Sequence, residues 1–579
     1  MNTAEYIIKK IEELGVNDIF GLPGDYNFDI LNTIEDNSQI NWIGCTNELN
    51  AGYAADGYAR IRGYGALVTT YGVGELSAIN AIAGAFAENI PIIHIVGLPK
   101  TDDIKNKKLL HHNFQDTNYS AFIDTYRSVT AAATILNRDN AKLEIDRIFK
   151  ILVRKKQPVY IGLPIDIANL DISDRYVPTD WASDKDVLNT VIEKITEKIN
   201  NSSNPVILGD VLIKRFNAEI EYREFVSHSN IPATNLLMGV NLLDTNLPNY
   251  IGGYYANLRN PIAEKHINDT DCLIAIGTIY SDINSFGHKI PYKINDHIAI
   301  YGDYTYIDGT KYENIKMSDV LDGICKTVLP KNLQIDKPNI GYKIKDTENN
   351  ELTSEYIYPR LQEFFKDNDI IIADTGSIPL GICQSNFPAS ADIQTQTLWA
   401  SIGWGTPAAF GASLAKPQAR TILITGDGSH QISAMEIGNM LRCGIKPIII
   451  VINNYGYATE RILSNNENSK YNNIASINYS KFARAFEGDI WATTSKTEED
   501  FDKALKVTQI MNKMCYIELC TVNNDVPKLA IDYSNDNKSI STKNTNIQKD
   551  ESLIPQKQEL TNSNTTYETI VHKNFGENE

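Results

Sequence analysis

Hydrophobic and polar positions in the first 180 residues alternate between two patterns. Apolar residues recur every three or four positions in some segments, whereas others, such as Ile90–Val96, are short and almost continuously apolar. The first pattern is typical of amphipathic helices, and the second of strands buried on both faces. The predicted helices are Thr3–Leu14, Ala51–Ile61 and Ala78–Glu88, and the predicted strands are Asp18–Gly21, Ala66–Tyr71, Ile90–Val96 and Gln157–Leu163. This alternation predicts a parallel sheet covered by helices on both faces.

Two further blocks follow along the chain. Polar stretches at Pro178–Lys185 and Pro330–Lys345 separate them, so the expected domains are residues 1–180, 186–335 and 350–530. The predicted strands are Pro205–Leu208, Cys272–Gly277, Ile370–Ala373, Thr421–Thr425 and Pro447–Ile452, and the predicted helices are Thr406–Leu414 and Ser433–Arg442. The expected fold class is therefore α/β, with three α/β domains built on parallel sheets. The two outer blocks share a pattern, which hints at duplication.

Residues 532–579 have a different character from the rest of the chain. They are rich in Asn, Ser, Thr, Lys and Glu and contain few large apolar residues. Burial of so few apolar groups cannot offset the entropy lost on ordering, so we expect a polar, largely disordered tail. The alternative is a C-terminal segment that folds over an active site.

Composition and charge narrow the classes of function. The 579 residues carry a formal net charge of −18, which argues against nucleic acid or an anionic membrane as the main partner, because both bind basic patches. Seven cysteines are widely spaced without a CxxC pair, so neither a disulfide framework nor a zinc site is expected. The N-terminus reads as a helix and not as a signal peptide, and no apolar run is long enough to span a membrane. We therefore expect a cytoplasmic protein with reduced thiols.

A short segment of the third block carries the candidate chemistry. The predicted strand Thr421–Thr425 runs directly into Gly426–Ser429, a Gly-Asp-Gly-Ser turn, and a helical pattern begins near Gln431. Glycines let a backbone approach a ligand closely, and the start of a helix offers free N–H groups that suit a phosphate. The strand–turn–helix order predicts a phosphate site beyond the end of the strand.

The next predicted strand supplies further oxygen atoms. Pro447–Ile452 is followed by Asn454 and Gly456, at a distance from Asp427 that suits one strand–helix–strand crossover. The Asp427 carboxylate, the Asn454 amide oxygen and the Gly456 carbonyl can then converge on one hard cation. Because Mg²⁺ takes oxygen ligands and usually keeps phosphate oxygens in its shell, the unit predicts a Mg²⁺–diphosphate site.

This unit resembles the cofactor-binding motif of the thiamine-diphosphate-dependent enzymes. The resemblance implies two thiamine-diphosphate-binding-fold domains that flank a different middle domain, with thiamine diphosphate and Mg²⁺ as cofactors. Residues Asn47–Arg60 match the family pattern Asn-Glu-x-x-Ala-x-x-Ala-Ala-Asp-Gly-Tyr-Ala-Arg. The match implies that Glu48 contacts the aminopyrimidine ring and drives ylid formation. Taken alone, Glu48 is an ordinary acid near the start of a helix.

Three more motifs are similar to those of the 2-oxo acid decarboxylases, the group of pyruvate, indolepyruvate and branched-chain 2-oxo acid decarboxylases. They are the loop Gly21–Asn27, the adjacent pair His111 and His112, and the segment Tyr455–Glu460. An isolated histidine pair is usually polar surface, but the three motifs occur together in the order of the group. The histidine pair is the most specific, because carboligases and oxidases of the superfamily generally lack it.

The resemblance implies a reaction as well as a cofactor. The chain would convert a 2-oxo acid to an aldehyde and CO₂ without oxidation, through a ylid and an enamine. Proton transfers are needed after CO₂ leaves, and histidine titrates in a suitable range. The catalytic residues implied are Asp25, Glu48, His111, His112 and Glu460.

Further cofactor contacts follow from the same resemblance. Ile402 matches a bulky apolar residue that bends the cofactor, and Thr70–Gly74 matches a loop that lines the site from the first domain. The full implied set is Glu48, Thr70, Ser377, Ala400, Ile402, Gly426, Asp427, Gly428, Ser429, Asn454, Gly456, Tyr457 and Ala458, with Asp427, Asn454 and Gly456 as metal ligands. Since these residues lie in two domains and the family builds each site between subunits, a homodimer or homotetramer is implied.

The sequence departs from the family pattern at a few positions near the implied cofactor and substrate. Ala400 stands where glycine is usual, Thr459 replaces a branched apolar residue, and Pro379 stiffens its loop. The candidates for the substrate pocket, Ile283, Ile378, Thr459 and Leu463, include no aromatic residue. We therefore hypothesise a substrate larger than pyruvate, either branched-chain or aromatic (including indolepyruvate).

Three alternatives remain open. The chain is a pyruvate decarboxylase proper, or an acetolactate-synthase-type carboligase that shares the cofactor motif and Glu48. His111, His112 and Glu460 argue against the carboligase. The third alternative is a degenerate homologue without catalysis, which Ala400 and Thr459 favour and the retained acids and bases disfavour.

Overall fold

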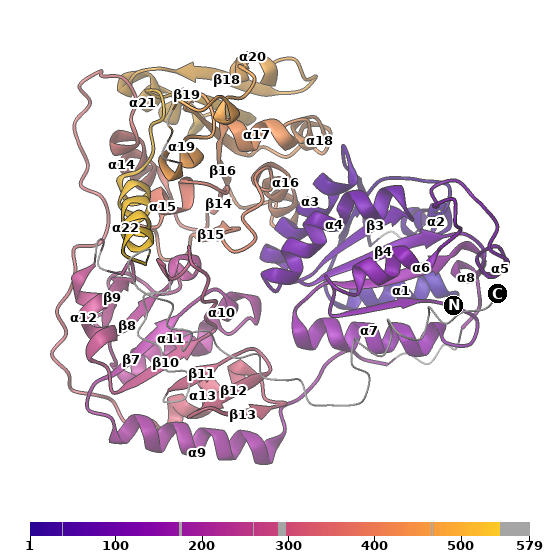
Figure 1. The fold of residues 1–579 in the computed structure, drawn as a ribbon, viewed down its shortest axis with the longest axis horizontal. Helices are drawn as coiled ribbons and strands as arrows, with labels where there is room; N and C mark the ends of the chain where they lie inside the picture. Colours follow the sequence, from indigo (N-terminus) through magenta and orange to yellow (C-terminus); the bar gives the residue numbers. More distant parts are fainter. Residues whose placement is uncertain are drawn as a thin grey trace. The chain divides into compact units, whose positions relative to one another are not determined.

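The structure is a computed structural model (Figure 1). It describes residues 1–36, 39–172, 177–256, 258, 260–287, 297–464, 466 and 468–544. Residues Met1–Ser534 form one compact unit, and Asn535–Glu579 form a second. Among the described residues, no helix is both long enough and apolar enough to cross a lipid bilayer.

The first unit contains three sheets, each with its own helices. The first sheet has six parallel strands in the order β2-β1-β3-β4-β6-β5. Its strands are β1 (Asp18–Gly21), β2 (Asn41–Gly44), β3 (Gly65–Thr70), β4 (Ile92–Leu98), β5 (Ala132–Ile135) and β6 (Val159–Pro164). Its helices are α1 (Thr3–Glu13), α2 (Phe28–Asp36), α3 (Glu48–Arg62), α4 (Val73–Ala87), α5 (Thr101–Lys105), α6 (Ser120–Tyr126), α7 (Ala141–Lys155) and α8 (Ile165–Ala168).

The third sheet repeats the strand order of the first. Its order is β15-β14-β16-β17-β19-β18, again with parallel pairs. Its strands are β14 (Ile370–Ala373), β15 (Asp392–Thr395), β16 (Thr421–Gly426), β17 (Ile448–Asn453), β18 (Ile490–Ser495) and β19 (Met514–Cys520). Its helices are α14 (Ser354–Phe364), α15 (Ile378–Ile382), α16 (Gly405–Ala415), α17 (Asp427–Ser433), α18 (Glu436–Arg442), α19 (Ala458–Leu463), η3 (Lys470–Asn472), α20 (Tyr479–Ala483), α21 (Glu498–Thr508) and α22 (Lys528–Asn544). The shared order agrees with the hint of duplication.

The middle sheet is mixed, not purely parallel. Its order is β13-β12-β11-β10-β7-β8-β9, and β11, β12 and β13 pair antiparallel. The cause is a two-residue hairpin turn at Asp308 and Gly309, both with positive φ, which joins adjacent strands directly. Its strands are β7 (Pro205–Gly209), β8 (Ala233–Asn235), β9 (Tyr250–Gly253), β10 (Cys272–Ile276), β11 (Ile298–Ile300), β12 (Tyr304–Ile307) and β13 (Thr310–Glu313), and its helices are α9 (Lys185–Asn201), α10 (Leu212–Arg215), α11 (Glu219–Ser229), η1 (Leu237–Gly239), α12 (Pro261–Asp269) and α13 (Met317–Thr327).

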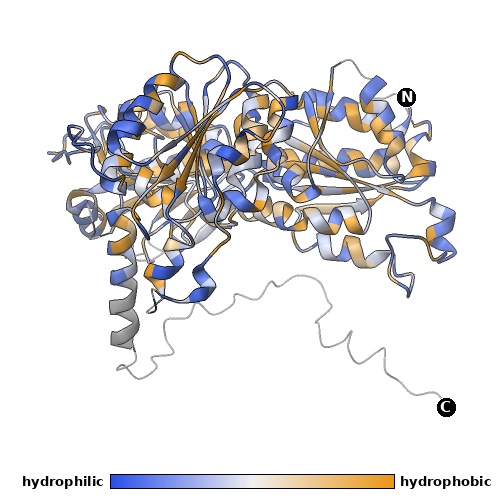
Figure 2. Cartoon of the chain, turned by 90° about the horizontal axis from the view of Figure 1, so that it is seen from above, coloured by the Kyte–Doolittle hydropathy of each residue, from blue (hydrophilic) through white to orange (hydrophobic). Residues whose placement is uncertain are grey.

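The three-domain α/β class is thus confirmed, with one antiparallel edge added. Figure 2 shows strands that carry mainly apolar residues, surrounded by helices that also carry polar ones. This distribution explains why nearly continuous apolar runs predicted the inner strands correctly. Each sheet falls within one of the expected residue ranges, while the domain boundaries themselves stay a prediction.

Some element bounds differ from the sequence-based ones. The helix expected near Gln431 begins at Asp427, because Gly426 already has the extended conformation of an N-cap. The helix expected from Ala78 begins at Val73, where the Glu75 side chain accepts a hydrogen bond from the backbone N–H of Gly72.

The start of the expected disordered tail is helical. Helix α22 covers residues up to Asn544, so the expectation is wrong for residues 532–544. The reason is burial: Leu529, Ala530 and Tyr533 lie on one face of α22 and pack into an apolar cluster with Phe286. The rest of the expected tail, residues 545–579, lies outside the described residues.

One helix pair joins the first and third sheets. Helices α3 and α16 pack so closely (Figure 1) that a Cβ on Gly411 would lie 1.8 Å from the carbonyl oxygen of Ala54. A Cβ on Gly57 would likewise lie 2.1 Å from the carbonyl oxygen of Ala408. Beside this contact, Arg60 pairs with Asp56 and Glu88, all three side chains being fully buried. Two domains that are far apart in sequence therefore share one apolar core.

We predict that Gly411→Ala will destabilise the protein strongly, because the added methyl must push two helix backbones apart. Overpacking of this kind costs about 3 kcal/mol, which lowers the thermal midpoint by roughly 5–10 °C. Gly44→Ala is the matched control, since its Cβ would meet no atom closer than 3.7 Å. Equal midpoints for the two variants in a calorimetric scan would contradict the tight packing.

Candidate active site

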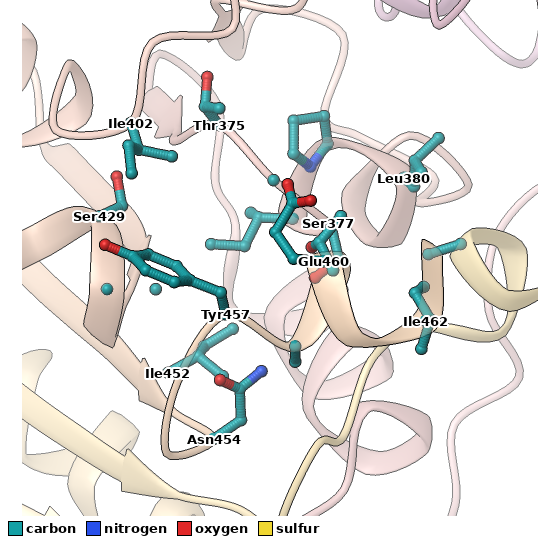
Figure 3. A pocket seen from close by; sticks show the side chains of 18 of the residues that line it. Thr375, Ser377, Leu380, Ile402, Ser429, Ile452, Asn454, Tyr457, Glu460 and Ile462 are labelled. Carbon is teal, nitrogen blue, oxygen red and sulfur yellow. The ribbon is translucent and has the colours of Figure 1, made fainter. Parts of the chain in front are cut away.

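A cavity of about 450 Å³ lies where β14, β16 and β17 end (Figure 3). The structure brings together here most of the residues predicted for the cofactor, and the predicted catalytic residue Glu460. They are Ser377, Ala400, Ile402, Gly426, Asp427, Gly428, Ser429, Asn454, Gly456, Tyr457, Ala458 and Glu460. Because parallel strands end at the same edge of a sheet, residues distant in sequence meet there.

Asp427 is the buried acid of this cavity. Its carboxylate accepts hydrogen bonds from the backbone N–H of Gly428 at 2.8 Å and of Gly456 at 3.0 Å. Burial raises the pKa of Asp427 to about 6, and these backbone donors oppose the rise. Among the described residues no ion pair includes Asp427, although the positive charge of Arg461 also opposes the rise in its pKa. The raised pKa shows that these groups stabilise the carboxylate only in part, and a divalent cation would supply further positive charge.

The other two proposed metal ligands lie beside this acid. The Asn454 Nδ2 donates to the carbonyl oxygen of Asp525 at 2.9 Å, which leaves the amide oxygen without a donor in the described part of the chain. Tyr455 and Gly456 both have positive φ, and their turn brings the Gly456 N–H onto Asp427. The residues present therefore fit an oxygen-ligated Mg²⁺.

The turn that precedes α16 forms another wall of the cavity. Ala400 has a φ of 54° and Gly403 a φ of 91°. An alanine in this left-handed region is strained, whereas a glycine would not be. Ile402 is 37% exposed and lines the cavity, so it is not an ordinary core isoleucine.

Glu48 opens α3, as predicted, where Asn47 caps the helix. A Cβ on Gly74 would lie 3.2 Å from Glu48 Oε1 and 3.2 Å from the Thr70 methyl, so the two side chains flank one spot. The Thr70 hydroxyl is buried and has no hydrogen-bond partner among the described residues. A buried polar group without a partner is unusual, and it marks a place that suits a polar ligand.

The predicted acid and two histidines lie together on the first domain. His111 Nε2 is 2.9 Å from Asp25 Oδ2, and His112 Nε2 is 4.0 Å from Asp25 Oδ1. Asp25 and His111 have about half of their side-chain surface exposed, so the cluster faces outward. His112 adopts a φ of 68°, an uncommon conformation that is often seen at functional sites.

Sequence reasoning missed the residue that supports this cluster. Glu75 is fully buried and accepts hydrogen bonds from the N–H of Gly72 at 2.8 Å and the hydroxyl of Tyr160 at 2.9 Å. A Cβ on Gly72 would lie 2.0 Å from the carbonyl oxygen of His112, so Glu75 fixes the backbone against which His112 packs. Burial raises the pKa of Glu75 to about 7. The Gly72–Glu75 spacing of a helix start was the available signal.

The two groups of residues do not meet within one chain. Among the described residues, none before Ile283 lines the cavity, so Asp25, Glu48, Thr70, His111 and His112 lie outside it. One chain therefore presents two partial sites.

The part of the cavity formed by Ile283, Ile378, Leu380, Ile462 and Leu463 is mainly apolar. The predicted lining residues Ile283, Ile378, Thr459 and Leu463 all line it, and Figure 3 shows Glu460 pointing into it from α19. Further lining residues, not foreseen from the sequence, are Ser354, Tyr358, Leu380, Ile462, Asp525, Ala530 and Tyr533. The four candidates named from the sequence contain no aromatic residue, but α14 and α22 add two tyrosines, Tyr358 and Tyr533, to the lining.

Comparison with known proteins gives one consistent result. Residues 1–122 match the description "Thiamine pyrophosphate enzyme, N-terminal TPP binding domain", residues 192–319 its "central domain", and residues 374–519 its "C-terminal TPP binding domain". A Schizosaccharomyces pombe protein with a provisional pyruvate decarboxylase name is 35% identical over 556 residues, which cover 91% of this chain and 97% of that protein.

Two further relatives carry the same name. The pyruvate decarboxylase of Kluyveromyces lactis is 34% identical over 490 residues, 81% of this chain and 86% of the relative. Pyruvate decarboxylase isozyme 2 of Saccharomyces cerevisiae is 32% identical over 535 residues, 87% of this chain and 94% of the relative.

We expect Ala400→Gly to raise stability slightly, by about 0.5–1 kcal/mol, because relief of the left-handed strain exceeds the added chain entropy. The dissociation constant for thiamine diphosphate should stay equal or fall, since a methyl beside the cofactor is removed. Thermal scans and calorimetric titration measure both. Ala412→Gly, in the buried middle of α16, is the control and should destabilise by about 1 kcal/mol or more. A loss as large for Ala400→Gly would refute the strain.

Proposed function

The chain belongs to the thiamine-diphosphate-dependent 2-oxo acid decarboxylase family, and from this membership we propose that it converts a 2-oxo acid into an aldehyde and CO₂. The observation that carries the proposal is the coexistence of a cation–diphosphate cavity and an outward-facing Asp25–His111–His112 cluster. A protein kept only for assembly would not need the buried Asp427 carboxylate at the edge of the sheet, whose pKa burial raises.

The family's cofactors are thiamine diphosphate and Mg²⁺. In our proposal Asp427, Asn454 and the Gly456 carbonyl hold the metal ion, and the backbone of Gly426–Ser429 faces the diphosphate. When bound, thiamine diphosphate supplies an electron sink for the electron pair that remains when the bond to CO₂ breaks.

Protein side chains carry the protons. Glu48 is placed to hold a proton at the aminopyrimidine ring, and the unpartnered Thr70 hydroxyl offers a polar contact beside it. Asp25 and the two histidines supply and accept protons at the reacting carbon after CO₂ has left, since carboxylate and imidazole groups within hydrogen-bond reach of each other can pass a proton between them. Glu460 reaches the same space from the cavity side.

A second copy of the chain is proposed to complete each site. Support comes from the separation of the two partial sites in one chain. It also comes from exposed apolar residues beside them: Val73 and Leu76 lie one turn apart on α4, and Ile432 and Met435 lie at α17 and α18. Apolar residues gathered on a surface are typical of subunit interfaces. We therefore propose a homodimer or homotetramer.

Subunit complementation tests this arrangement directly. Glu48→Gln should nearly abolish turnover, and Asp427→Asn should first weaken Mg²⁺ and cofactor binding. If each site takes Glu48 from one chain and Asp427 from the other, co-expression of the two variants should restore about a quarter of wild-type activity, because half the dimers are mixed and each has one intact site. If both residues act within one chain, the mixture stays inactive.

The proposal about the substrate concerns the size of the side chain of the 2-oxo acid. The cavity is lined by Ile283, Ile378, Leu463 and the short Thr459, which leaves room for an apolar substituent, while Tyr533 limits its length. We therefore propose that branched-chain 2-oxo acids are accepted as well as pyruvate. Pyruvate alone is the second candidate, favoured by the names of the relatives.

A substrate panel with added thiamine diphosphate and Mg²⁺ separates these candidates. We expect kcat/KM for 3-methyl-2-oxobutanoate to lie within about tenfold of that for pyruvate, since one or two methyl groups in an apolar pocket change binding by roughly that factor. Phenylpyruvate should be poor, and Tyr533→Ala should improve it relative to pyruvate. A preference for pyruvate above a hundredfold would remove the larger substrate but keep the reaction.

The product identifies the reaction class. An aldehyde supports the decarboxylase, whereas an acetohydroxy acid would indicate the carboligase alternative. Absence of cofactor binding in calorimetry with Mg²⁺ would favour the non-catalytic alternative. We also propose a cytosolic location, which the seven free thiols support.

A further inference from the structure

Asp374 is a buried carboxylate that directly follows β14 and lies behind the wall of the cavity. It is fully buried. Its Oδ1 accepts hydrogen bonds from the backbone N–H of Thr375 at 2.9 Å and of Gly405 at 3.0 Å. Its Oδ2 accepts hydrogen bonds from the hydroxyls of Thr425 at 2.7 Å and Ser429 at 2.5 Å. Four donors from three elements therefore converge on one side chain.

Ser429 links Asp374 to the turn Ala400–Gly403. Ser429 Oγ donates its only proton to Asp374 and accepts a hydrogen bond from the N–H of Gly403 at 2.7 Å. One helical turn later, Ser433 Oγ donates to the carbonyl oxygen of Gly403 at 2.7 Å. Two serines on α17 thus hold both backbone groups of Gly403, which has a left-handed φ.

This arrangement assigns the Ser429 hydroxyl a task other than ligand binding. A serine hydroxyl has one proton, and here the proton points at Asp374. It is not free to donate to a diphosphate, so only the backbone N–H of Ser429 remains for that contact. The hydroxyl acts instead as a relay between Asp374 and Gly403.

We infer that Asp374 is a positioning residue that sets the turn Ala400–Gly403 through Ser429. The inference rests on the proposed function, since this turn matters because it contacts the cofactor. Ala400 is strained, so the turn keeps its shape only while its surroundings over-determine it. Asp374 supplies this constraint from the side of α17, and the effect reaches Ile402 at the cavity wall.

The position of Asp374 outside the cavity excludes a direct contact with metal ion or substrate. It lines no part of the cavity and forms no ion pair among the described residues. Burial raises the pKa of Asp374, while the hydroxyl and N–H donors lower it. A carboxylate so placed neither binds the metal ion nor touches substrate, and its four donors leave it fixed.

The test uses single variants of the full chain with two readouts that do not need turnover. One is the calorimetric dissociation constant for thiamine diphosphate at saturating Mg²⁺. The other is amide hydrogen exchange in the peptide containing residues 400–405, measured without cofactor. Asp374→Asn and Ser429→Ala should each raise the dissociation constant about tenfold, the effect of losing one buried hydrogen bond. Both should also speed exchange in the peptide.

Thr425→Val is the matched control, because it removes another donor to the same Asp374 oxygen without touching Gly403. It should leave both readouts within twofold. Double variants give a further test. Adding Asp374→Asn to Ser429→Ala should change neither the dissociation constant nor the exchange rate further, since both substitutions break one relay. Adding Asp374→Asn to Ser433→Ala should give the sum of the two single effects, since Ser433 makes a separate contact. When Asp374→Asn is saturated with cofactor, its KM for the 2-oxo acid should equal that of the wild type.

Two outcomes would overturn the inference. One is wild-type affinity and exchange in Ser429→Ala. The other is an equal change in Thr425→Val, which would reveal a general loss of stability. If Asp374→Asn does not fold, the comparison of Ser429→Ala and Ser433→Ala with the control Thr425→Val still tests the relay. If the wild-type chain binds no thiamine diphosphate, the proposed function fails, but exchange at residues 400–405 still tests the relay.

Discussion

The contact of α3 with α16 is the constraint on which the site depends. The two helices touch backbone to backbone at Gly57 and Gly411, so the first and third sheets share one core. The segment that leads into α16 is then fixed from the first domain: Glu88 accepts hydrogen bonds from the N–H groups of Leu398 and Trp399. The turn Ala400–Gly403 comes directly after these two residues. Its shape therefore depends on both domains and not on its own sequence.

Buried acids that accept hydrogen bonds from N–H and O–H groups organise the region around the site. Asp374, Asp427 and Glu75 are each surrounded by N–H or O–H donors, which stabilise charge without closing off the side chain as an ion pair would. Each fixes a strained piece of backbone: the turn at Ala400, the turn at Gly456 and the support of His112. A scaffold of this kind presents polar groups in preset positions before any ligand arrives. The strain is local, and the packed sheets beneath it supply the stability.

The sequence predicted most of the inner strands and most of the cavity. Runs such as Thr421–Thr425 are apolar because both faces of their sheet are covered, so periodicity finds them. Asp427 and Asn454 were predictable because a βαβ unit must place them at one edge. Asp374, Glu75 and α22 were not. Their importance comes from partners far along the chain, such as Ser429 for Asp374 and Phe286 for Tyr533.

By itself, the sequence determined the α/β class and the cofactor chemistry and supplied the candidate acids and bases, because strand periodicity and short motifs are local properties. Only the tertiary structure decided which of these residues share a cavity. It placed Asp427 and the Asp25–His111–His112 cluster apart within one chain, added Tyr533 to the cavity wall, and directed the Ser429 hydroxyl to Asp374. The physical reason is that direction and distance between side chains arise from packing between elements, which no local pattern records.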